Sequence, residues 1–279
     1  MKNLIIRALT GAVYVLLLVG CTVYSPVTAF IFFGLVAAAT VTEYCHVMNR
    51  HAGASLVTPL CALVAMLLVA AVWLMSVASP SASRMTALWG LLLIILFVGE
   101  LFRRAEDPLR NWSLTALSQV YIALPFSLLP LLCVSTNAAT GQPAYDYVRP
   151  LCLFIFLWVN DTGAYLSGLG LHGFIPAKLF ERVSPKKSWE GFWGGAVCAL
   201  LLSLLLSHWL ETLPLSGWLI VAVLVVVFGV FGDLFESMLK RHLGLKDSGH
   251  FMPGHGGMLD RFDAVLVSFP MVWLYLMIR

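Results

Sequence analysis

The stretch GWLIVAVLVVVFGVFGDLFESMLK, residues 217–240, decides the fold class. It opens with an apolar run long enough to cross about 30 Å of hydrocarbon as a helix. Runs of this kind recur along the chain of 279 residues, which is 60% apolar and only 11% charged. Soluble proteins carry about 25% charged residues. A backbone in lipid must satisfy its own hydrogen bonds, and these runs do not alternate as barrel strands do. The sequence therefore predicts an all-α, polytopic helical membrane protein.

About nine transmembrane helices are expected from the apolar runs. They lie at roughly 8–24, 26–42, 57–78, 85–102, 114–135, 148–170, 192–209, 217–238 and 262–278. With these spans, all Lys and Arg residues except Arg84, Arg149 and Arg279 fall on one side. Basic residues favour the cytoplasmic side, so we expect a cytoplasmic N-terminus and a location in the inner, cytoplasmic membrane.

The two halves of the chain differ in their chemistry. Residues 1–147 are apolar with short connections, and we expect an N-terminal helical scaffold there; Glu43 and Glu100 are interpreted as residues at the membrane interface. Residues 148–279 have two long polar connections and acids inside apolar runs, which indicates a catalytic half. We expect the two halves to form one integrated domain.

Three acids in the second half interrupt apolar sequence. Asp161 lies in FLWVNDTGAY, and Asp233 and Glu236 lie in the stretch quoted first. An acid near the centre of a membrane helix costs about 2.5–3.5 kcal/mol on insertion scales. These side chains should therefore face a protein interior or a water-filled cavity. A structural ion pair or a helix-end position is the alternative to a functional role.

The spacing of the charges favours a functional role. Positions 233, 236, 237 and 240 share one helix face, which aligns two acids with Ser237 and Lys240. Asp260 and Asp263 are spaced i, i+3 where the last span begins. Magnesium takes one or two protein carboxylates and completes its shell with water and substrate phosphates. Basic side chains nearby would neutralise the remaining phosphate charge.

The connections contribute three further motifs. PGHGG at 253–257 offers a backbone without bulky side chains that can approach a phosphate closely, with His255 as a hydrogen-bond donor or a structural histidine. SPKKSWEG at 184–191 is a basic cluster that binds either phosphate or anionic lipid. GFWGG at 191–195 places two glycines four residues apart, which favours close helix packing.

Several patterns point away from other functions. GLGLHG at 168–173 matches a dinucleotide motif in letters but lacks the strand and helix that such a site needs. The six cysteines stand singly, without metal-binding spacing. No basic patch with interleaved aromatic residues occurs, so nucleic acid is not an expected partner.

The charged region as a whole resembles a known family. Residues 237–263, SMLKRHLGLKDSGHFMPGHGGMLDRFD, are similar to the signature of phosphatidate cytidylyltransferases, also called CDP-diacylglycerol synthases. NDTGAY at 160–165, SPKKSWEG and GDLFES at 232–237 also resemble recurring motifs of that family. The resemblance covers roughly residues 150–270. It implies the reaction of CTP with phosphatidate to give CDP-diacylglycerol and pyrophosphate. The expected cofactor is Mg²⁺, alone or together with a second cation, and the expected assembly is a homodimer.

Roles follow from the resemblance together with the charge pattern. The expected catalytic residues are Asp233, Asp260, Asp263, Lys240 and Arg241. The expected metal ligands are Asp233, Asp260, Asp263 and Glu236. The expected substrate-binding residues are Asp161, Lys186, Lys187, Ser237, Lys246, Asp247, His255, Gly256, Gly257 and Arg261. Two other functions stay open at this point: a cation-coupled transporter and a CTP-dependent lipid-alcohol kinase.

Overall fold

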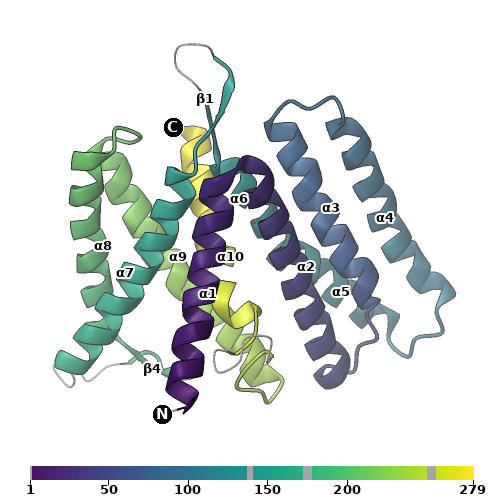
Figure 1. Ribbon diagram of the computed structural model, residues 1–279. Helices are drawn as coiled ribbons and strands as arrows, with labels where there is room; N and C mark the ends of the chain where they lie inside the picture. The colour runs from purple at the N-terminus through teal and green to yellow at the C-terminus, as the bar shows by residue number, and fades with distance from the viewer. Residues whose placement is uncertain (1, 137–140, 172–177, 250–255) are drawn as a thin grey trace. The chain divides into compact units, whose positions relative to one another are not determined.

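A computed structural model of the chain describes residues 2–136, 141–171, 178–249 and 256–279 (Figure 1). It divides into two compact units, which we describe separately. The first unit comprises Met1–Tyr147 with Leu245–Phe262, and the second comprises Val148–Gly244 with Asp263–Arg279. The polar segment 245–262 thus belongs to the same unit as the N-terminal helices.

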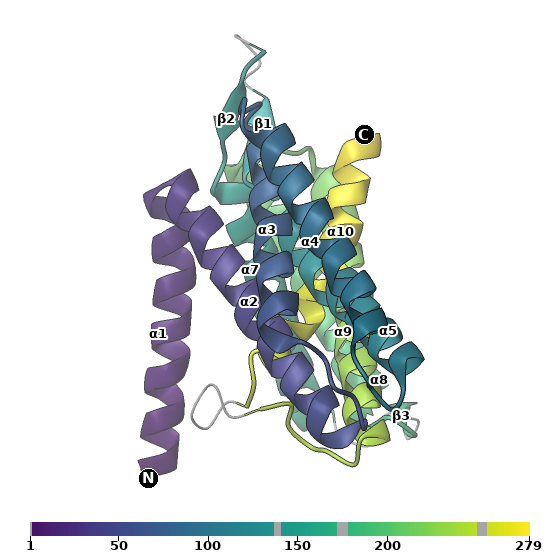
Figure 2. The same ribbon diagram turned by 90° about the vertical axis from the view of Figure 1, so that its right-hand side faces the viewer.

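The first unit is a helical bundle. Its helices are α1 (Lys2–Tyr24), α2 (Pro26–His51), α3 (Thr58–Ser76), α4 (Ala82–Phe102), α5 (Pro108–Leu117), η1 (Ser118–Ala123) and α6 (Leu124–Leu132). Figure 2 shows α1 and α2 joined at a tight turn and diverging away from it. Ser25 forms that turn: its hydroxyl accepts the N–H of Thr28 in a capping box, and Pro26 follows at the first helical position.

One expected span is an irregular helix. The expected helix over 114–135 is the continuous run α5–η1–α6, which contains a π-helical segment just before Pro125. Proline lacks the N–H that would continue the α-helical ladder, and a wider turn next to it accommodates the missing bond. After it, β1 (Val134–Thr136) pairs antiparallel with β2 (Pro143–Tyr145), a hairpin that the apolar pattern does not predict.

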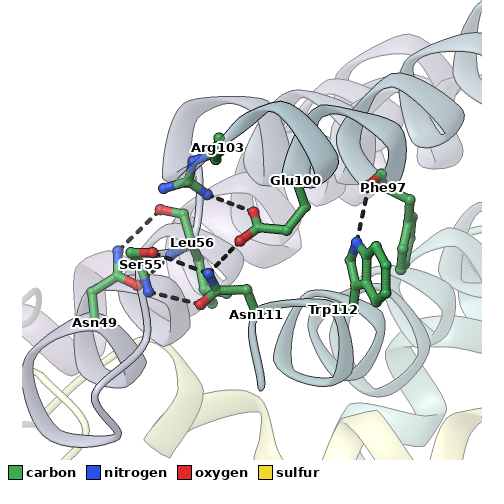
Figure 3. Close-up of polar contacts among 8 residues, drawn as sticks. All are labelled: Asn49, Ser55, Leu56, Phe97, Glu100, Arg103, Asn111 and Trp112. Atoms are coloured by element: carbon green, nitrogen blue, oxygen red, sulfur yellow. Dashed lines mark hydrogen bonds and ion pairs between the residues drawn. The ribbon is translucent and has the colours of Figure 1, made fainter. Parts of the chain in front are cut away.

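A buried polar cluster joins the ends of three helices in the first unit (Figure 3). Glu100, which we expected at a membrane interface, is 5% exposed. Its carboxylate accepts from Arg103 Nη1 at 2.8 Å and from Asn111 Nδ2 at 2.6 Å. Asn111 Oδ1 in turn accepts the N–H of Ser55 in the α2–α3 connection at 2.9 Å. The cluster therefore has a structural role within this bundle.

The second unit consists of α7 (Val148–Gly170), β3 (Lys178–Phe180), β4 (Ser184–Ser188), α8 (Trp189–Trp209), α9 (Leu215–His242) and the larger part of α10 (Leu259–Ile278). Glycines let α7 and α8 pack closely. A Cβ on Gly195 would lie 2.7 Å from the carbonyl oxygen of Asn160, and a Cβ on Gly191 3.1 Å from that of Ala164. The close helix packing predicted from GFWGG is confirmed.

The all-α membrane fold is confirmed, and the chain is an integral membrane protein. Among the described residues, eight helices are long and apolar enough to cross a membrane, while Leu9–Tyr24 in α1 forms a shorter apolar helix. The total of nine spans and the cytoplasmic side of the N-terminus stay predictions. The basic motif SPKKSWEG has a defined structure, because it forms β4 and the N-cap of α8.

Candidate active site

A cavity of about 760 Å³ lies within the second unit, among α7, the β3–β4 hairpin, α8 and α9. It is large enough for a nucleotide-sized ligand, since ligand pockets span about 300–1,000 Å³. Its charged lining residues are Lys178, Lys186 and Lys187 together with Asp161, Glu190 and Asp233. The three lysines provide positive groups for an anionic ligand, and the three acids balance their charge. Lys178 and Glu190 were not expected at the site from the sequence.

An ion pair joins the β4 motif to helix α9 at this cavity. Lys187 Nζ lies 2.5 Å from Asp233 Oδ2, and the two side chains are 23% and 34% exposed. Lys186, the preceding residue, is exposed. Successive side chains of a strand point to opposite faces, so the hairpin directs the two lysines differently. Of the two lysines, Lys187 is the one that contacts Asp233.

Helix α9 aligns its polar residues as the spacing predicts. One turn beyond Asp233, Glu236 Oε2 lies 2.6 Å from Lys240 Nζ, and the Glu236 side chain is 2% exposed. Ser237 is partly buried on the same face. The structure thus contains the ion pairs that were one alternative for these acids. It also places two carboxylates and two lysines side by side, which is an arrangement suited to phosphate and a cation.

Asp263 joins this group because α9 and α10 approach at a glycine. A Cβ on Gly232 would lie 2.3 Å from the carbonyl oxygen of Asp263 and 2.9 Å from the Cα of Ala264. The Asp263 carboxyl consequently lies close enough to Asp233 and Glu236 for their negative charges to act on it. With all side chains ionised, three acids and two lysines would carry one net negative charge, which a bound cation or a proton would neutralise.

These residues fit a hard divalent cation in part. Among the described residues, no three His, Cys, Asp or Glu side chains are arranged as a metal-binding group. A magnesium site does not need three, because one or two carboxylates suffice when water and substrate phosphates complete the shell. Asp233 and Asp263 would supply two carboxylates to such an ion.

The polar segment of the first unit is ordered around Asp260. Asp260 Oδ2 accepts the N–H of Gly257 at 2.7 Å and the N–H of Ser248 at 3.1 Å. Gly256 has φ +85°, and a Cβ there would lie 2.5 Å from Asp260 Oδ2. A side chain at position 256 would therefore be strained and crowded. Gly256 and Gly257 allow the backbone to wrap around the Asp260 carboxylate.

Glu43 of α2 contacts this segment, although no motif near Glu43 in the sequence assigns it to the site. Its carboxylate accepts from Ser248 Oγ at 2.6 Å, Met258 N at 2.8 Å and Leu259 N at 3.1 Å. We expected Glu43 at a membrane interface. Its partners lie more than 200 residues away in the sequence, so no local spacing connects them.

The structure thus brings the expected site residues together in two groups. In the second unit it joins Asp233, Glu236, Asp263, Lys187 and Lys240. In the first unit it joins Asp260 with Gly256 and Gly257. Convergence of Asp233 with Asp260 stays a prediction. The remaining charged candidates are exposed, and they are Asp161, Lys186, Arg241, Lys246, Asp247 and Arg261. His255 lies outside the described residues.

The sequence is similar to those of proteins with a known name. The sequence model of a family described as the cytidylyltransferase family matches residues 5–279. A protein of Staphylococcus epidermidis named phosphatidate cytidylyltransferase is 44% identical over 126 residues, covering 44% of this chain and 46% of that protein. Proteins with the same name from Haemophilus influenzae and Staphylococcus haemolyticus are 36% identical over 191 residues and 41% over 138. These two alignments cover 65% and 48% of this chain, and 63% and 50% of the relatives. The chain thus matches between about half and under two thirds of the length of these relatives.

Proposed function

The chain belongs to the cytidylyltransferase family, and on that premise we propose that it transfers the cytidylyl group of CTP to phosphatidate. The products are CDP-diacylglycerol and pyrophosphate. The observation that carries the proposal is the Lys187–Asp233 pair on the wall of a cavity lined by further lysines, with Asp263 beside it. The relatives named phosphatidate cytidylyltransferase support the same substrates for this chain.

The chemistry requires little beyond positioning and charge neutralisation. A phosphate oxygen of phosphatidate attacks the α-phosphorus of CTP and forms a new P–O–P linkage, while the bond from the α-phosphorus to the oxygen that bridges the α- and β-phosphates breaks. Pyrophosphate leaves with that electron pair. The attacking phosphate is already anionic at neutral pH, so no general base has to remove a proton. The main obstacle is repulsion between two anions, which oriented positive charges overcome.

The cavity residues match that task. Lys178, Lys186 and Lys187 would bind phosphate oxygens of the nucleotide and the lipid head group. Asp233 orients Lys187 through their ion pair. On α9, Lys240 and Arg241 lie in the last turn, where we propose that they bind phosphate as well. Because the cavity belongs to a unit of membrane-spanning helices, phosphatidate would enter it from the lipid leaflet.

Magnesium is part of the proposal. Asp233 and Asp263 would hold it, with Asp260 and Glu236 as the further proposed ligands. When bound, the cation supplies positive charge that stabilises the transferring phosphoryl group. The fit is supported by the close approach of α9 and α10 at Gly232, which brings the Asp263 carboxyl under the influence of the negative charges of Asp233 and Glu236.

Location and assembly complete the proposal. CTP is a cytosolic metabolite, so we place the site at the cytoplasmic face of the inner membrane, in agreement with the bias of basic residues. We also propose a homodimer, which rests on the family resemblance alone.

Two labels on CTP test the function directly. The purified protein is incubated with phosphatidate, Mg²⁺ and CTP labelled at either the α- or the γ-phosphorus. Cytidylyl transfer moves the α-label into lipid and the γ-label into pyrophosphate. A lipid kinase would instead move the γ-label into lipid and release CDP. A transporter would leave both labels in CTP, and either of these outcomes would overturn the proposal.

A further inference from the structure

We propose that Glu43 of helix α2 is a positioning residue that holds residues 248–249 and 256–260, and with them Asp260, in their working geometry. The inference rests on the proposed function, because it assigns Asp260 to the site of that reaction. Glu43 lies outside the family motifs quoted from the sequence, all of which fall within residues 150–270. All of the contacts that carry it lie within the first unit.

Glu43 caps the N-terminus of helix α10. Met258 and Leu259, whose N–H groups donate to its two carboxylate oxygens, stand at the start of that helix. The first N–H groups of a helix have no partner inside the helix, and the helix dipole favours negative charge there. A carboxylate from a distant helix thus takes the place of a local N-cap. It fixes the first turn of α10, where Asp260 lies.

Ser248 links Glu43 to Asp260. Ser248 connects the two carboxylates, because its hydroxyl donates to Glu43 Oε1 at 2.6 Å and its N–H to Asp260 Oδ2 at 3.1 Å. Ser248 is only 5% exposed. Loss of the Glu43 carboxylate would therefore release both the Ser248 hydroxyl and the first turn of α10. Each of these contacts orients Asp260.

Two glycines border the Glu43 carboxylate. A Cβ on Gly257 would lie 2.0 Å from Glu43 Oε1, and a Cβ on Gly249 would lie 2.6 Å from Glu43 Oε2. Two glycines of the polar segment thus make room for one side chain of α2. This gives the glycine-rich motif a second purpose besides approach to a phosphate: the backbone closes around a carboxylate.

The donors that the structure records for Glu43 are one hydroxyl and two backbone N–H groups, all neutral. Groups that orient metal ligands through hydrogen bonds typically change metal affinity or activity by about 10–100-fold when they are removed. We expect Glu43→Gln, which keeps the shape but presents an NH₂ group to N–H donors, to produce an effect of this size.

The test compares Glu43→Gln with Glu100→Gln. Glu100 is a matched control, because it is also a hydrogen-bonded carboxylate of the first unit, but its partners lie in α4 and α5. Initial rates are measured against Mg²⁺ concentration in the purified proteins. For Glu43→Gln, we expect the Mg²⁺ concentration at half-maximal rate to rise about 10-fold or more. For Glu100→Gln, it should stay at the wild-type value even if less folded protein is recovered.

Hydrogen exchange provides a readout that does not depend on activity. Amides of residues 245–249 and 256–262 should exchange faster in Glu43→Gln and at the wild-type rate in Glu100→Gln. A Glu43→Gln protein with wild-type exchange in this segment, or one that loses rate with an unchanged Mg²⁺ curve, would overturn the positioning role. A wild-type protein without CTP turnover whose segment still loosens in Glu43→Gln would contradict the proposed function while supporting the anchoring by Glu43.

Discussion

Lys187 Nζ lies 2.5 Å from Asp233 Oδ2, although the two residues are 46 positions apart and come from a two-stranded hairpin and a membrane helix. The pair links the basic motif SPKKSWEG to the acidic end of α9. Both residues line the same cavity. An ion pair that borders a cavity can exchange one partner for a ligand, which is the property that the proposed reaction needs.

Asp233→Asn should reduce CTP-dependent turnover at least about 100-fold, the effect of removing one preorganised electrostatic group from an active site. The change keeps the volume of the side chain and removes the charge that holds Lys187 and a cation. Initial rates of CDP-diacylglycerol formation measure it.

The control is Asp107→Asn, at the exposed N-cap of α5, where Asp107 Oδ1 accepts the N–H of Arg110. Asparagine caps helices as well as aspartate does, so this variant should keep the wild-type rate. Near-normal turnover in Asp233→Asn would refute the role of this carboxylate.

Gly232→Ala should both destabilise the protein and reduce turnover. The new methyl group would lie 2.3 Å from the Asp263 carbonyl oxygen, so α10 must move away from α9 and take Asp263 with it. Overpacking of this kind costs about 1–3 kcal/mol. The melting temperature in detergent and the rate report the two effects.

Gly90→Ala in α4 is the matched control, because a Cβ there meets nothing within 4 Å. Alanine is favoured over glycine inside a helix by about 1 kcal/mol, so this variant should melt at the same temperature or higher. If Gly232→Ala behaved like Gly90→Ala, the close approach of the two helices would be disproved.

Lys240→Met should destabilise the protein much more than Lys246→Met. Lys240 pairs with Glu236, whose side chain is 2% exposed, whereas Lys246 is exposed. Removing one partner of a buried ion pair costs roughly 3–5 kcal/mol, because the other charge stays buried. Thermal melting of both variants tests this.

A second substitution identifies the cause. If the loss comes from the uncompensated Glu236 charge, adding Glu236→Gln to Lys240→Met should restore part of the stability. A double variant that is less stable than Lys240→Met alone would show that the two residues stabilise the fold independently.

Chelation of divalent cations should stop turnover reversibly. We expect EDTA to abolish formation of CDP-diacylglycerol and added Mg²⁺ to restore it, because the acids at the site need a cation to bind phosphate. Full formation of CDP-diacylglycerol in EDTA would contradict the role of magnesium, although cytidylyl transfer itself would still be supported.

The sequence predicted those features that depend on regular spacing. The helical period aligned Asp233, Glu236 and Lys240 on α9, and the four-residue spacing of Gly191 and Gly195 predicted a close helix contact. Apolar length predicted the spans. Each of these inferences uses only neighbours within one helix.

Features that depend on distant contacts could not be predicted in the same way. Glu43 meets Ser248 across 205 positions, and nothing near Glu43 in the sequence marks it as part of the polar segment. The strands β1 and β3 have three residues each, too few for an alternating pattern. Because β3 is so short, the sequence did not predict that Lys178 would line the cavity.

A structure determined with Mg²⁺ and a non-reactive CTP analogue tests the central claim most directly, since it measures the distances from the cation to the acids. We predict that Asp233, Asp263 and Asp260 surround one site, with at least Asp233 and one other carboxylate about 2.0–2.1 Å from Mg²⁺. We also predict that the triphosphate lies against Lys187. A bound nucleotide away from Asp233, or Asp233 and Asp260 on opposite sides of the membrane, would contradict the account.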